Sequence, residues 1–485
     1  MKRLSDCLYV SLLCVALAFT SCSSWEEPAG VSEQIPPIFP DYAGVTVPCN
    51  IAPLNFMVEG AGKIQAVLML EGSELMRASG KEGVIEFPMK KWQAVLSEAK
   101  GRDLAVLVSL WSPEYPEGMS YSPFYIHVAE EQIDGWVAYR LIEPGYVGWR
   151  QLGLYQRELS SFHESAIITN RKTTTTCLNC HEFPSYSPES MVFHARGANG
   201  GTIVYDEGKL QKVDFTTIGL KKNVTYPSWH PQGRYIAFSA NFTRQIFYVE
   251  GRQQVEVFDT SSDLLVYDAK TGEAVTDPRF TTPESLETFP TWSPDGKYLY
   301  FASHSADSVV TTFFPDMQYD LLRVAFDAES KTFGQEVDTL YNALVMGGSV
   351  SHPRVSPDGR YLVYTLSDYG TFPIWHDEAD LKMLDLETME HVDISMWNDP
   401  ESADSYHVWS SNGRWMVFGS RRLDGRYTRL FIAYLDKEGR PCKPFLLPQE
   451  DPRHNVWRLR SYNKPELING KVSLPGNAED MFVEE

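Results

Sequence analysis

Residues 289–304 read FPTWSPDGKYLYFASH, and three variants of this stretch occur elsewhere in the chain. They are YPSWHPQGRYIAFSAN at 226–241, HPRVSPDGRYLVYTLS at 352–367 and YHVWSSNGRWMVFGSR at 406–421. Each has an aromatic or Pro entry, a Ser-Pro-Asp-Gly-like turn, a basic residue and then alternating apolar residues. Asp-Gly and Asn-Gly supply the positive φ angles that tight hairpins need. The pattern therefore predicts repeated β-hairpins.

A further strand pattern follows each hairpin, at 262–275, 319–333, 379–392 and 428–441. The turn glycines Gly233, Gly296, Gly359 and Gly413 are 63, 63 and 54 residues apart. Two strand pairs per repeat correspond to one blade of a β-propeller. The repeats are longer than the roughly 40–45 residues of a common blade, so we expect extra material in the loops.

The repeats resemble the WD40-like propeller repeats of the TolB family, most closely at Trp292–Lys297, which reads WSPDGK. The resemblance covers roughly residues 200–475 and implies a β-propeller over 201–475, with a tail at 476–485. We expect about five blades, with six as the alternative. The fifth would combine two strands within 200–215 with partners within 454–468, because such closure hides the sheet edges and locks the ring.

The segment before the repeats reads mostly as strands from 44 to 170, with one helical pattern at 89–101. It predicts a β-sandwich-like domain, so the fold class is all-β. We find no Ser-His-Asp arrangement and no carboxylate pair there, and we interpret His163 as a surface or packing residue.

Composition excludes one class of partner. The chain has 485 residues, 43% of them hydrophobic and 22% charged, which is ordinary for a globular protein. Its net charge is −21, with 64 acidic against 43 basic residues. A field of this sign repels phosphate backbones, so nucleic acid is not an expected partner.

Residues 1–22 have the pattern of an export signal, with Lys2 and Arg3 before an apolar run that ends at Ser21-Cys22. The segment resembles a bacterial lipoprotein signal, which implies lipidation of Cys22, a tether at 23–43 and a membrane attachment through lipid only. The lipobox is imperfect, and an ordinary secretory signal is the alternative. We expect a cell-envelope lipoprotein of the outer membrane, on its periplasmic or outer face.

The segment 171–200 contains Cys177-Leu178-Asn179-Cys180-His181, a C-x-x-C-H motif. Covalent haem needs two thiols for its vinyl groups and an adjacent histidine for the iron, and this motif offers all three. A redox disulfide would need a βαβ setting, and a zinc site would need further ligands. Cys49 and Cys442 could form a disulfide, although nothing in the sequence requires it.

The wider stretch resembles haem-attachment regions of envelope propeller proteins that carry one haem c. This resemblance implies thioether bonds at Cys177 and Cys180 and proximal ligation by His181. For the sixth ligand we favour His194 over Met191, and the open alternative is that the iron has none. Arg196 could pair with a haem propionate.

These observations support three functions. The first is an envelope-anchored haem protein for electron transfer or redox sensing, with unidentified redox or envelope partners. The second is a TolB-like scaffold without catalysis, and the third is a haem-containing propeller oxidoreductase. Propellers also accompany serine peptidases, but no G-x-S-x-G elbow follows this one. Fold alone does not separate these functions.

Overall fold

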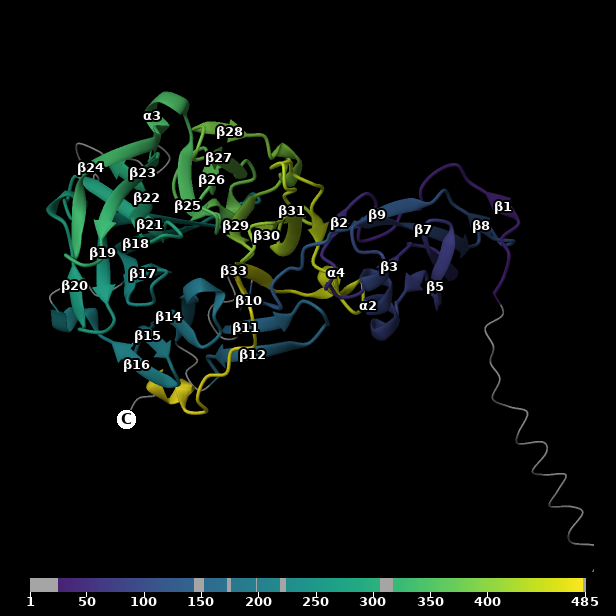
Figure 1. Cartoon of the computed structure of the whole chain (residues 1–485), viewed down its shortest axis with the longest axis horizontal. Helices are drawn as coiled ribbons and strands as arrows, with labels where there is room; N and C mark the ends of the chain where they lie inside the picture. The colour runs from purple at the N-terminus through teal and green to yellow at the C-terminus, as the bar shows by residue number, and fades with distance from the viewer. Residues whose placement is uncertain are drawn as a thin grey trace, which may run out of the picture.

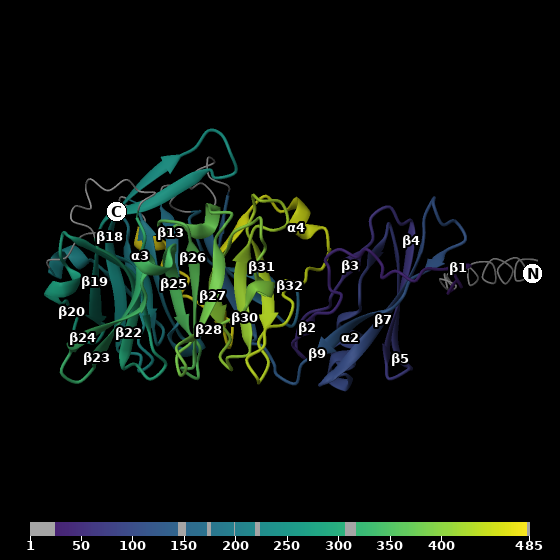
Figure 2. The same ribbon diagram turned by 90° about the horizontal axis from the view of Figure 1, so that it is seen from above.

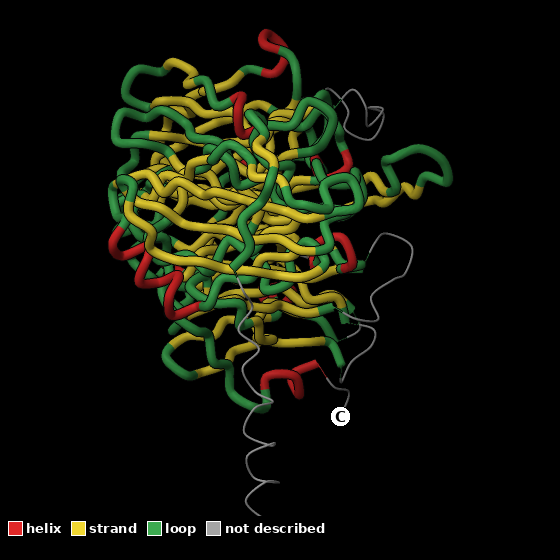
Figure 3. The backbone as a smooth tube through the Cα atoms, turned by 90° about the vertical axis from the view of Figure 1, so that its right-hand side faces the viewer, coloured by secondary structure: helices red, strands yellow, loops and turns green. Residues whose placement is uncertain are grey.

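The computed structural model describes residues 25–143, 152–171, 176–197, 199–218, 224–305 and 317–482. The signal segment and the predicted lipid site Cys22 lie outside these residues. Nearly all regular elements are strands (Figure 3), which confirms the all-β class. A ring of sheets lies beside a smaller N-terminal domain (Figure 1). In the described part of the chain, no helix has the length and apolarity needed to cross a membrane.

The N-terminal domain is built on one seven-stranded sheet with the order β1-β8-β7-β4-β5, in which β9 joins β7 to β2. Helix α2 (Met89–Glu98) buries Trp92, Val95 and Leu96 in the core of this domain. Only β3 and β6 form a second sheet, so the described residues lack the second large layer of the predicted sandwich. The strands are β1 (Gly30–Val31), β2 (Thr46–Val47), β3 (Phe56–Met57), β4 (Lys63–Leu70), β5 (Ser73–Lys81), β6 (Val84–Ile85), β7 (Arg102–Trp111), β8 (Met119–Ser120) and β9 (Phe124–Val128).

Among the described residues, the ring contains four four-stranded sheets and one eight-stranded sheet. The eight-stranded sheet divides at the single residue pair that joins β19 to β21, so we number six four-stranded blades, 1 to 6. The innermost strand of each blade contacts the innermost strand of the next blade. In blade 1 the innermost strand is β33, which contacts β13, so these contacts close around the ring. The strands are, for blade 1, β10 (Trp136–Ile142), β11 (Gly153–Glu158), β12 (Glu164–Thr169) and β33 (Ser461–Ile468); for blade 2, β13 (Cys177–Glu182), β14 (Ser190–Arg196), β15 (Gly201–Asp206) and β16 (Lys209–Val213); for blade 3, β17 (Val224–Trp229), β18 (Tyr235–Phe247), β19 (Val255–Asp268) and β20 (Glu273–Val275); for blade 4, β21 (Ser285–Trp292), β22 (Tyr298–Ser305), β23 (Asp320–Asp327) and β24 (Thr332–Tyr341); for blade 5, β25 (Ser349–Val355), β26 (Tyr361–Ser367), β27 (Asp380–Asp385) and β28 (Glu390–Val392); and for blade 6, β29 (Asp404–Trp409), β30 (Trp415–Ser420), β31 (Arg429–Tyr434) and β32 (Phe445–Leu446).

The closing blade differs from the predicted one. The C-terminal strand β33 pairs with β10, with Arg140 opposite Asn463, and not with the strands of 201–213. Those strands, β15 and β16, have their own partners in β13 and β14. The ring therefore begins at Trp136, inside the predicted sandwich, and includes the predicted haem segment. Blades 1 and 2 escaped notice because neither carries the Ser-Pro-Asp-Gly turn.

The repeated turns have the predicted geometry. Gly296 and Gly359 have φ angles of 73° and 79°, in the left-handed region that favours glycine. In the turn that contains Gly296, the Ser293 hydroxyl donates to Asp295 over 2.6 Å, and the Lys297 backbone N–H donates to the same carboxylate over 3.1 Å. This confirms that the acidic residues of the repeat hold turns.

The innermost strand of every blade has a β-bulge at an equivalent position. In each case one residue adopts a φ angle between 44° and 53°, and the register to the neighbouring strand shifts there. Bulges bend a strand and redirect a side chain. The six bulge residues, in ring order from blade 1, are Lys464, Cys180, Tyr226, Phe289, His352 and Tyr406.

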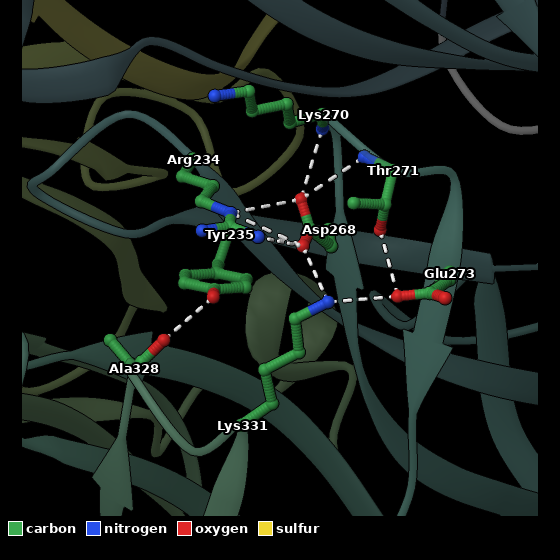
Figure 4. Close-up of polar contacts among 8 residues, drawn as sticks. All are labelled: Arg234, Tyr235, Asp268, Lys270, Thr271, Glu273, Ala328 and Lys331. Atoms are coloured by element: carbon green, nitrogen blue, oxygen red, sulfur yellow. Dashed lines mark hydrogen bonds and ion pairs between the residues drawn. The ribbon is translucent and has the colours of Figure 1, made fainter.

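Neighbouring blades are joined by polar networks as well as apolar cores. Figure 4 shows one between blades 3 and 4, centred on the fully buried Asp268. Its carboxylate lies 2.6 Å from Arg234 and 2.9 Å from Lys331. Burial alone raises the pKa of Asp268, but hydrogen bonds from Arg234 and Lys331 outweigh it and hold the pKa well below its usual range. The carboxylate is therefore charged and connects the two blades.

The N-terminal domain packs against blade 6. Buried residues of both parts belong to one apolar cluster, including Val45 and Trp415. At its edge the Tyr434 hydroxyl donates to Glu131 over 2.8 Å, and the Ser411 backbone N–H donates to Asp134 over 2.8 Å. This shared core ties the domain to the ring.

Candidate functional site

The C-x-x-C-H motif forms β13, the inner strand of blade 2, and not a separate haem-wrapping loop. Cys177 lies opposite Arg196, and Asn179 opposite His194, on the neighbouring strand β14. The bulge at Cys180 then interrupts this register. As a result, Cys180 has the place in blade 2 that an aromatic, histidine or lysine residue has in the other blades.

Both cysteines of the motif are buried free thiols that line one cavity in the channel of the ring. The Arg140 guanidinium donates to the Cys177 sulfur over 3.2 Å and to the Asn179 side-chain oxygen over 3.2 Å. The sulfur of Cys180 lies 2.9 Å from the Thr225 hydroxyl. The structure thus places both cysteines that are predicted to form thioether bonds in the wall of one cavity.

This channel cavity has a volume of about 210 Å³. Five of the six bulge residues line it: Lys464, Cys180, Tyr226, His352 and Tyr406. Its walls are largely apolar or aromatic and come from the β18–β19 hairpin and the segment before β27, namely Phe247, Val255, Val257, Phe372, Ile374 and Trp375. A mostly apolar space with a few polar groups is the usual form of a ligand site.

The β18–β19 hairpin forms part of this wall because its strands are long, and it projects beyond the face of the ring (Figure 2). Glu256 of the hairpin lies 2.7 Å from the ring nitrogen Nε2 of His376, and both side chains are buried. Arg252 reaches Asp377 over 3.4 Å. These contacts fix the hairpin to blade 5.

His181 does not line the channel cavity. Glu182 accepts a hydrogen bond from the Trp229 backbone of blade 3, so the preceding side chain, His181, faces blade 1. Its ring also contacts Phe183, which directly follows β13. Its polar contact is with the backbone of Ala138 in blade 1. Burial, and next the charge of Lys464, lower the pKa of His181 to about 3. The ring is therefore neutral at physiological pH.

The two predicted sixth ligands lie on opposite faces of blade 2. Met191 is fully buried in the core shared with blade 1. His194 faces the other way, and its Nδ1 lies 3.1 Å from the Thr202 hydroxyl. Burial and the nearby Arg196 lower the pKa of His194 to about 3. The sheet of blade 2 lies between the rings of His181 and His194, so the structure does not bring this pair together.

His352 is a cavity residue that the sequence analysis missed. It lies at the bulge of blade 5, with its ring 4.0 Å from that of Phe289 and 4.5 Å from that of Tyr406, centroid to centroid. Both ring nitrogens lack a hydrogen-bond partner in the described part of the chain. Burial, and next the charge of His407, lower its pKa well below the usual range. The repeated X-Pro pairs, here His352-Pro353, were the available signal.

The charge of the channel cavity is opposite to that of the whole protein. Arg140, Arg196, Arg421 and Lys464 line it, against one described carboxylate, Glu143. The protein itself has a net charge of −21. Low-dielectric walls strengthen a local field, so the cavity favours an anionic ligand.

A second cavity, of about 290 Å³, opens at the other end of the channel. Arg354 lines this second cavity and pairs with Glu182 over 3.3 Å and with Glu466 over 2.6 Å. The side chains of this charged cluster, together with the bulge residues, separate the channel cavity from the second cavity. Within the described ranges, no group of three or more His, Cys, Asp and Glu side chains is arranged to hold a metal ion.

The channel cavity fits some requirements of a haem c and not others. The two buried thiols and the cationic groups suit its vinyl and propionate groups. The volume of 210 Å³ is below the roughly 300–1,000 Å³ of common ligand pockets, so a haem would need the cavity to widen. His181 faces away from the thiols, whereas His352 shares their cavity.

No family model matches the chain, and no curated protein matches it. Among solved structures it is similar to TolB from Acinetobacter baumannii, at 14% identity and a TM-score of 0.43, over 78% of this chain and 85% of that one. It is also similar to the propeller domain of the Trilobed protease from Pyrococcus furiosus, at 12% identity and a TM-score of 0.34, over 64% and 82% of the two chains. Prolyl oligopeptidase B from Galerina marginata is similar at 12% identity and a TM-score of 0.36, over 63% of this chain and 44% of that one. The propeller assignment made here rests on the sheet topology.

Proposed function

We propose that this protein is an exported β-propeller that carries one haem c in its central channel, bound through Cys177 and Cys180, and that it serves electron transfer. The observation that carries the proposal is that both thiols of the motif line the same channel cavity. A bound haem would supply one-electron redox chemistry. The cationic residues of the cavity would balance its propionates, and the aromatic wall would exclude water from its edge.

Two histidines are candidates for the iron. The motif predicts His181, which is fully buried. The geometry favours His352, because its ring lines the same cavity as Cys180. Both are neutral at physiological pH, which is the form that ligates metals.

The test is to express the full chain in a bacterium with haem-attachment machinery and to record its spectrum. We expect a sharp reduced α-band that remains with the polypeptide after denaturation. Cys177→Ala with Cys180→Ala should abolish it. The matched control is Cys49→Ala with Cys442→Ala, because these free thiols lie outside the cavity. A wild-type protein without covalent haem would overturn the proposal.

We further propose that the chain is anchored in the bacterial envelope by lipid on Cys22, which follows an apolar run of signal length. Labelling with a radioactive fatty acid should mark the wild type and not Cys22→Ala. Equal labelling of both proteins would show that Cys22 is not the lipid site.

A second function, favoured by the small volume of the cavity, is that of a binding protein that takes a smaller anionic ligand without haem. The same spectrum separates the two functions, because this alternative predicts no covalent haem in the wild type.

A further inference from the structure

Arg421 has an environment that its neighbour in sequence does not share. It follows β30 in blade 6 and is 2% exposed. Its Nε and Nη1 atoms are buried without a hydrogen-bond partner among the described residues, and no acceptor for its guanidinium is found there. Arg422, by contrast, donates to Asp404 over 2.7 Å and to the Trp397 carbonyl over 2.6 Å. The half-buried guanidinium of Arg422 has its hydrogen-bond acceptors, and the fully buried guanidinium of Arg421 does not.

The surroundings of Arg421 hold it in place and only partly offset its charge, through the carboxylates of Asp424 and Asp377. Its Cζ atom lies 3.2 Å from the ring centroid of Trp375, a cation–π arrangement. Both residues line the channel cavity. Burial lowers the pKa of Arg421 to about 9, so the group is still charged at neutral pH. A buried charge without a partner destabilises a fold, which makes this position hard to explain by stability alone.

A second arginine occupies the same place in another blade. The segments SMVFHAR at 190–196 and WMVFGSR at 415–421 align, so Arg196 ends β14 and Arg421 directly follows the equivalent strand β30. Arg196 also lines the channel cavity, and its Nε is likewise buried without a partner in the described residues. Arg140 lines the cavity too, and its Nε is also buried without a partner there, so three guanidiniums of the cavity have a donor group to spare.

We infer that Arg421, held by Trp375, is the anchor of a carboxylate-binding subsite in the channel cavity, with Arg196 as its counterpart. The planar donor fork of arginine matches a carboxylate, and such charge-assisted bonds are the strong ones. The inference deepens the proposed function and rests on it for the identity of the ligand, because a haem brings two propionates. A free organic acid would bring the same group.

The test uses the full chain with Cys177→Ser and Cys180→Ser, so that binding is reversible. Haemin and its dimethyl ester, which lacks free carboxylates, are titrated in turn and followed by absorbance. Arg421→Gln should weaken haemin binding roughly 10- to 100-fold and leave the ester unaffected. The control, Arg426→Gln, makes the same charge change at an exposed position and should alter neither. Equal haemin affinity in Arg421→Gln and its parent would overturn the inference.

A second arm addresses a free acid. If haemin does not bind the parent, the melting temperature is measured with succinate and with benzoate. A rise that Arg421→Gln abolishes supports the subsite with a free acid as its ligand, and no Arg421-dependent rise overturns it. Absence of covalent haem in the wild type would defeat the proposed function alone, because the thiols are already removed here.

A third measurement separates a binding role from a structural one. Arg421→Met keeps the length and the contact with Trp375 but removes the unpartnered charge. We expect the ligand-free variant to melt at the same or a higher temperature than its parent, because the buried charge is costly without an acceptor. A clear fall in melting temperature would show that the guanidinium is needed for the fold and would overturn the inference.

Discussion

The side chains of Cys180 and His181 diverge at the bulge of β13. Cys180 lines the channel, and His181 turns toward blade 1. The motif could be recognised from the sequence because its five residues are contiguous. The direction of each side chain could not, because it depends on the bulge, and His352 and Arg421 reach the cavity only through ring closure.

At the scale of single residues, the iron ligand gives a sharp prediction. On the haem-loaded protein, we expect His352→Ala to change the spin state and to permit carbon monoxide binding, because axial identity controls haem properties. His194→Ala and Met191→Ala should resemble the wild type, since their side chains pack within blade 2. Absorbance and electron paramagnetic resonance spectra check this. A change in His181→Ala alone would assign the ligand to the motif histidine.

At the scale of elements, the hairpins were predictable because their signals are local: the turn residues and the alternating strands lie within sixteen positions. Blade 1 was not predictable in this way. Its strands β10 to β12 carry no turn motif, and their inner partner β33 comes from the far end of the chain. For the same reason, the prediction that the strands of 201–213 pair with the C-terminal strand was wrong.

The turns differ in what surrounds them, and this leads to a prediction about stability. A Cβ atom at Gly296 would lie 2.3 Å from the ring nitrogen Nε2 of His230 in the neighbouring blade, whereas one at Gly359 would meet nothing within 4 Å. Both have positive φ angles, which cost a non-glycine residue about 1–2 kcal/mol. Gly359→Ala should lower the free energy of unfolding by about that amount, and Gly296→Ala by clearly more. Urea denaturation measures both, and equal losses would contradict the inter-blade contact.

At the scale of the whole molecule, β33 should control the ring. Deleting residues 453–485 removes the inner strand of blade 1 and exposes the edge of β10. We expect the whole propeller to lose cooperative unfolding, seen as a broad, earlier calorimetric transition. Deleting only residues 476–485 should keep one transition at a lower temperature, because Phe482 packs in the core of blades 1 and 2 but no strand is lost. Unchanged cooperativity without β33 would mean that the ring holds without closure.

The pairing of β10 with β33 also has a consequence for biogenesis. A chain that is made from its N-terminus delivers β10 long before its partner. Until then, blade 1 presents an open strand edge, and the channel, which needs Lys464 and Asn463 of β33 for its lining, is incomplete. Ligand loading through the finished cavity can therefore occur only after the last strand has been delivered. A nascent chain stalled near residue 450 would be a target for chaperones and proteases.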